Sequence, residues 1–71
     1  MDQHELKTPG QILQAALARE EEARDFYRHL AMGCRVDFIR ELLEKLGNEE
    51  AKHVGLVQDM ITRLHLGENI M

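Results

Sequence analysis

Residues 37–66 read DFIRELLEKLGNEEAKHVGLVQDMITRLHL, and their apolar residues recur with the spacing of a packed helix. Two rows repeat every seven residues, Ile39, Leu46, His53 and Met60 on one and Leu43, Glu50, Val57 and Leu64 on the other. Such heptad rows are typical of helices in bundles and coiled coils. We therefore expect one helix over about 37–66, with Asp37 as its N-cap and Gly67 as its C-cap.

A second helical pattern precedes this one. Thr8, Pro9 and Gln11 have the order of an N-cap, a first helical residue and a capping-box partner. The pattern runs to about residue 32, and Gly33 is expected to end it in a left-handed conformation. Its rows are Leu13, Glu20, Tyr27 and Cys34, beside Ala16, Ala23 and Leu30. Helices over about 9–32 and 37–66 predict an all-α, antiparallel helical hairpin that forms one domain across residues 1–71.

Composition narrows the class of protein. The chain has 71 residues and a net charge of −4, and it has no block of basic residues, which argues against nucleic acid as a partner. No apolar run approaches the roughly 20 residues that span a bilayer, and residues 1–5 do not resemble a secretory signal. A single cysteine, Cys34, cannot form an intrachain disulfide. We therefore expect a cytoplasmic protein that is not bound to a membrane.

The heptad rows hold only part of the apolar residues. Nine more flank them: Ile12, Leu17, Phe26, Ala31, Phe38, Leu42, Val54, Leu56 and Ile61. A two-helix hairpin has one layer, so each helix can cover only part of the other's apolar surface. A second copy of the chain would supply the second layer, and we expect a homodimer that forms a four-helix bundle.

Three polar residues interrupt the core rows, namely Glu20, Glu50 and His53. Glu50 and His53 form a Glu-x-x-His pair, which lies on one face of a helix. If the turn is centred near residues 34–35, then Glu20 and Glu50 both lie about 22 Å from it, at a rise of 1.5 Å per residue. All three side chains should therefore meet at one level of the bundle.

Carboxylates in a bundle core are very unfavourable unless they are compensated. A dimer would hold four Glu and two His, and two divalent cations would balance the four carboxylates. Oxygen and imidazole ligands without a thiolate suit Fe or Mn and are compatible with Zn or Co. A Glu from each of two helices with Glu-x-x-His from each of the other two is the dimetal pattern of ferritin-like proteins.

Seven residues carry a family resemblance: Ala16, Glu20, Ala23, Tyr27, Glu49, Glu50 and His53. From about Gln11 to Leu64 the chain resembles one half of a rubrerythrin-type domain of the ferritin-like superfamily. The resemblance implies that Glu20, Glu50 and His53 are the metal ligands and that Tyr27 lies near the site. It also implies two iron ions per dimer, which would oxidise ferrous iron or reduce peroxide or dioxygen.

The chain also departs from full rubrerythrins. It has half of their helices and lacks the paired Cys-x-x-Cys motifs of their second iron site, so turnover as a peroxidase would need an external electron donor. The resemblance extends to half-bundle proteins packaged in protein nanocompartments. Two other functions therefore remain open: an iron-handling or storage component without turnover, and a structural dimerisation hairpin. His4, His29 and His65 are expected at the surface, and Cys34 is expected to have no role.

Overall fold

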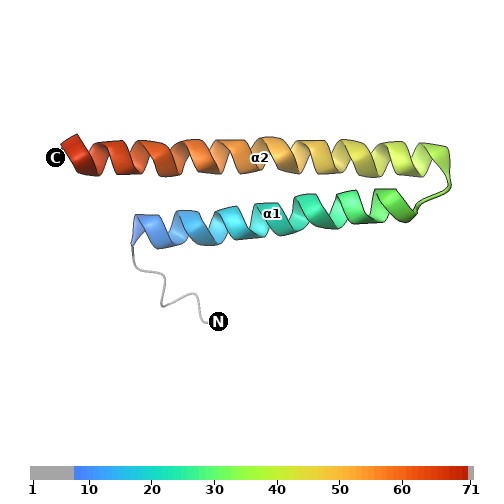
Figure 1. Ribbon diagram of the computed structural model, residues 1–71, viewed down its shortest axis with the longest axis horizontal. Coiled ribbons are helices and arrows are strands. Elements are labelled where there is room, and N and C mark those ends of the chain that lie inside the picture. The colour runs from blue at the N-terminus through green and yellow to red at the C-terminus, as the bar shows by residue number, and fades with distance from the viewer. Residues whose placement is uncertain (1–7, 71) are drawn as a thin grey trace.

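The computed structural model describes residues 8–70, and of residues 68–70 only the backbone. Helix α1 spans Pro9–Gly33 and helix α2 spans Asp37–Ile70. The two helices run antiparallel and side by side, and a short connection over residues 34–36 joins them (Figure 1). The chain is therefore an all-α hairpin, as the sequence predicts.

The start of α1 is fixed by a capping box. The hydroxyl of Thr8 accepts a hydrogen bond from the backbone N–H of Gln11 at 3.1 Å, and the Gln11 side chain accepts one from the N–H of Thr8 at 3.2 Å. Pro9 occupies the first turn, where its missing N–H leaves no hydrogen bond unmade. The predicted start of the helix is confirmed.

The predicted end of α1 is wrong in its geometry. Gly33 belongs to the helix, and among the described residues no glycine has a positive φ. Cys34 leaves the helix in an extended conformation, and its N–H donates to the carbonyl of Ala31 at 3.2 Å. The Arg40 guanidinium then donates to the Cys34 carbonyl at 3.4 Å. The helix thus ends in an extended residue whose N–H and carbonyl are both bonded, and it does so without a left-handed glycine.

Two expectations for α2 are also corrected. Asp37 is the first helical residue and not the N-cap, because the Val36 carbonyl already accepts from the N–H of Arg40 at 2.9 Å. The Asp37 carboxylate pairs with the Arg40 guanidinium at 3.0 Å, in a first turn that favours negative charge. Gly67 does not end the helix, which continues to Ile70, and a helical glycine costs about 1 kcal/mol relative to Ala.

The hairpin is one helix thick. Its principal extents are 52 × 28 × 12 Å, and the shortest of these is about the diameter of a single helix with its side chains. Among the described residues, the only apolar side chains classed as buried are those of Ala31 and Val54. Many large apolar side chains stay exposed, for example Phe38 at 74%, Leu56 at 64% and Phe26 at 59%. No helix in the described part is long and apolar enough to cross a membrane.

Candidate metal centre

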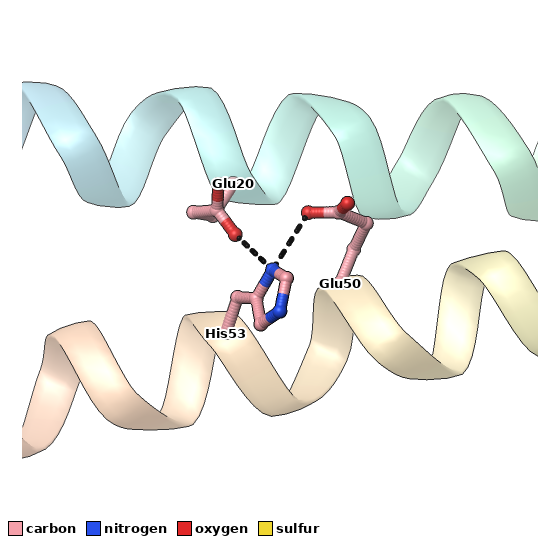
Figure 2. A group of neighbouring side chains, drawn as sticks. All are labelled: Glu20, Glu50 and His53. Carbon is pink, nitrogen blue, oxygen red and sulfur yellow. Dashed lines mark ion pairs between the residues drawn. The ribbon is translucent and has the colours of Figure 1, made fainter.

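The three polar residues from the core rows lie together midway along the hairpin. Glu20 projects from α1, and Glu50 and His53 project from successive turns of α2 toward it (Figure 2). Nδ1 of His53 lies 2.8 Å from Oε2 of Glu20 and 3.4 Å from Oε2 of Glu50. One potential ligand atom from each residue lies within 4.8 Å of the other two. The convergence that helix phase and hairpin geometry predict is therefore present.

The two carboxylates are less exposed to solvent than the imidazole. The side chains of Glu20 and Glu50 are 27% and 21% exposed, whereas that of His53 is 49% exposed. Both Oε2 atoms are closed off from solvent, and neither accepts a hydrogen bond of acceptable geometry within the described part of the chain. Nδ1 of His53 lies at ion-pair distance from both atoms, a contact that carries a positive charge only when the imidazole is protonated (Figure 2). Burying carboxylate oxygens in this way is costly unless a positive charge compensates them.

This geometry fits a bound cation. Protein ligands lie about 2.0–2.2 Å from a transition metal, so two ligand atoms at roughly right angles are about 3 Å apart. The two distances from Nδ1 of His53 are close to that value. Carboxylate and neutral imidazole are both suited to Fe and Mn, and also to Zn. Glu20, Glu50 and His53 could therefore hold a divalent metal through Oε2, Oε2 and Nδ1.

Tyr27 lies one heptad after Glu20 on α1. Its ring packs edge to face on the ring of Phe26, with the ring centroids 5.5 Å apart. Its hydroxyl makes no hydrogen bond within the described residues, so a contact between Tyr27 and the ligand residues stays a prediction.

The other histidines and the cysteine lie apart from this group. His29 and His65 are exposed, as expected, and Cys34 is partly exposed in the connection, where its thiol lies 3.6 Å from the Val36 carbonyl. His4 lies outside the described residues. Glu49, which directly precedes Glu50, turns outward and pairs with Lys52 at 3.4 Å.

Arg24 and Asp25, which follow Glu20 on α1, form an ion pair with each other. The Arg24 guanidinium donates to the carboxylate of Asp25 at 2.9 Å. This bond lowers the pKa of Asp25 and raises that of Arg24. The Asp25 side chain is 65% exposed and that of Arg24 is 24% exposed. Of residues 20–22, Glu20 is the carboxylate that groups with Glu50 and His53.

Comparison with known families supports the same class of protein. Residues 11–71 match the rubrerythrin family, a stretch that includes all of α2, α1 from its third residue on, and all three candidate ligands. Searches of curated proteins and of solved structures gave no match. Because the match extends over most of the chain, the chain belongs to the rubrerythrin family.

Proposed function

We propose that two copies of this chain form a four-helix bundle that binds two iron ions and carries out redox chemistry with peroxide or dioxygen. The observation that carries the proposal is the group of Glu20, Glu50 and His53, whose ligand atoms meet within 4.8 Å. Two of those atoms are closed off from water and have no hydrogen-bond donor among the described residues. A metal ion would supply the missing positive charge.

The exposed apolar side chains support the dimer. Successive residues of a helix are about 100° apart, and on each helix most of these side chains fall within an arc of about 100°. Seen from one end of the hairpin, residue numbers advance clockwise around one helix and counterclockwise around the other, because the helices are antiparallel. On each helix the arc lies about 100° from the side that faces the other helix, in the direction of decreasing residue angle. Both arcs therefore lie on the same side of the hairpin. We call this side the apolar face; it comprises Ile12, Phe26, Leu30, Phe38, Ile39, Leu42, Leu56 and Met60.

The candidate ligands border the apolar face. His53 precedes Met60 by seven residues and so points within about 20° of it. The half-exposed imidazole therefore lies where a second copy would pack. A two-fold axis there would bring together four carboxylates and two imidazoles, and two divalent ions would neutralise the four negative charges. The site and the dimer are thus expected to form together.

Iron is the metal that the family match favours, and the ligand set is compatible with it. Two bound ferrous ions would supply one electron each. With two protons, these two electrons would reduce hydrogen peroxide to two water molecules. The residues of the chain would hold the ligand atoms in place and balance the charge. Apolar side chains around them would limit the access of water.

Metal content and molecular mass, measured on the same sample, test this function. We expect a dimer by light scattering and close to two iron atoms per dimer after anaerobic loading with ferrous iron. Glu50→Ala and His53→Ala should each abolish stoichiometric binding. Glu49→Ala is the matched control, because Glu49 is adjacent in sequence but pairs outward with Lys52. Two irons retained in both ligand variants would refute the assignment, and many irons per dimer would indicate storage instead.

A further inference from the structure

Gly47 lies where α2 packs closely on α1. It is buried, although it has no side chain to be covered. A Cβ atom built on it would lie 3.4 Å from Cγ of Arg28, 3.6 Å from Cβ of Tyr27 and 3.8 Å from the backbone carbonyl oxygen of Arg24. The last contact is with the backbone of α1, so at this level α2 packs against the helix itself and not only against its side chains.

This close packing is next to the candidate metal ligands on both helices. Gly47 precedes Glu50 by three residues, less than one turn of α2. On α1 the contacted residues, Arg24, Tyr27 and Arg28, occupy the two turns that follow Glu20. The distance between the helices at Gly47 therefore sets how far the Glu20 carboxylate stands from Glu50 and His53.

We infer that Gly47 is a positioning residue for the metal centre, an inference that rests on the proposed function. The three contact distances are ordinary van der Waals contacts for a methyl group, and a Val or Leu side chain would add atoms beyond it where α1 lies. Metal–ligand distances tolerate a change of only about 0.2 Å. A larger side chain at position 47 would push α1 away from α2 and move Glu20 out of reach of an ion held by Glu50 and His53.

Gly55 provides a matched control within the same helix. It follows His53 by two residues, so it is as close in sequence to the ligands as Gly47. A Cβ atom built on Gly55 meets no atom within 4 Å. Replacing either glycine brings the same change in helix propensity, so a difference between the two positions reports packing against α1.

The test is a series of Ala, Val and Leu at position 47 and the same series at position 55. Each full-length variant is titrated with Co²⁺ alone, and the visible absorption of bound Co²⁺ gives both affinity and ligand geometry. We expect Gly47→Ala to bind within about threefold of wild type and Gly47→Val to bind about 10- to 100-fold more weakly, the range seen when support of metal ligands is lost. The position 55 series should match wild type.

A second comparison separates positioning from stability. Removing the nearest contact with Arg28→Ala should restore part of the Co²⁺ affinity lost in Gly47→Val. Circular dichroism and light scattering are the controls: the variants compared must have the helicity and the molecular mass of wild type. If Gly47→Leu does not fold, the Ala and Val variants decide the question.

The outcomes are distinguishable. Wild-type protein that does not bind Co²⁺ contradicts the proposed function. Wild-type protein that binds Co²⁺, together with folded position 47 variants that bind it equally well and with the same spectrum, overturns the role of Gly47 alone. An equal loss of Co²⁺ affinity in the position 47 and position 55 series also overturns the role of Gly47.

Discussion

Two methionines on opposite sides of the hairpin give a direct test of the apolar face. Met60 belongs to this face and is 47% exposed, whereas Met32 is 86% exposed and lies about 200° around α1 from Leu30. If association only followed exposed apolar surface, Met32 would matter more. If the apolar face is the dimer interface, Met60 alone should matter. Met60→Gln and Met32→Gln are therefore a matched pair.

The size of the effect follows from the exposed fraction. Full burial of a methionine side chain contributes about 1.5–3 kcal/mol, so covering the exposed half of Met60 contributes about 0.7–1.5 kcal/mol. The dimer contains two copies, which gives about 1.5–3 kcal/mol. Because about 1.4 kcal/mol is tenfold in an equilibrium constant, the dissociation constant of the Met60→Gln dimer should rise by about 10- to 150-fold.

Sedimentation equilibrium over a range of protein concentrations measures that constant for both variants and for wild type. We expect Met32→Gln to leave it within about twofold. An equal effect of the two substitutions, or a larger one for Met32, would show that copies do not associate through the apolar face. A monomer at all concentrations in wild type would exclude the dimer itself.

Three further predictions follow from the described contacts. Thr8→Ala removes the capping hydroxyl and should destabilise each chain by about 1 kcal/mol, seen as a lower thermal midpoint at fixed protein concentration, whereas Thr8→Ser should retain the cap; an unchanged midpoint for Ala would contradict this. Glu50→Gln removes a shielded negative charge beside Glu20, so the free energy of unfolding of the metal-free protein should rise by about 1 kcal/mol. Ferrous iron should no longer stabilise this variant. A metal-free variant that is less stable than wild type would show that the carboxylate is compensated without metal. The bond from Arg24 lowers the folded-state pKa of Asp25, so its small stabilisation is present at neutral pH and disappears as the pH falls through that pKa; NMR titration of Asp25 should give a pKa below that of an unpaired aspartate, and Arg24→Ala should raise it.

Helix phase made part of the site predictable. The covalent geometry of a helix fixes which residues share a row, so Glu20, Glu50 and His53 could be placed on inward positions from their spacing alone. A hairpin then has only one variable, the position of its turn, and Gly33 located it to within a few residues. The meeting of the three side chains follows from these two facts, and the structure has it.

Other features depend on directions that spacing does not define. The exit from α1 is determined by where α2 lies, and the bond from Arg40 to the Cys34 carbonyl holds that exit in extended form, so Gly33 needs no left-handed turn. The close packing at Gly47 depends on how far each helix is rotated about its own axis. Gly47 and Gly55 both lie in the interior of α2, and the contacts of Gly47 with Arg24, Tyr27 and Arg28 distinguish the two.

The thinness of the hairpin has a consequence for how the protein behaves in a cell. Within the described residues one hairpin buries Ala31 and Val54 and covers its other apolar side chains only in part, a small core against the conformational entropy lost when a chain of this length becomes ordered. If folding is completed by a second copy, it becomes a bimolecular event, and the folded amount rises with the square of the chain concentration when chains are scarce. The rate of synthesis then controls the folded fraction as well as the amount: doubling a low chain concentration would give about four times as much folded protein.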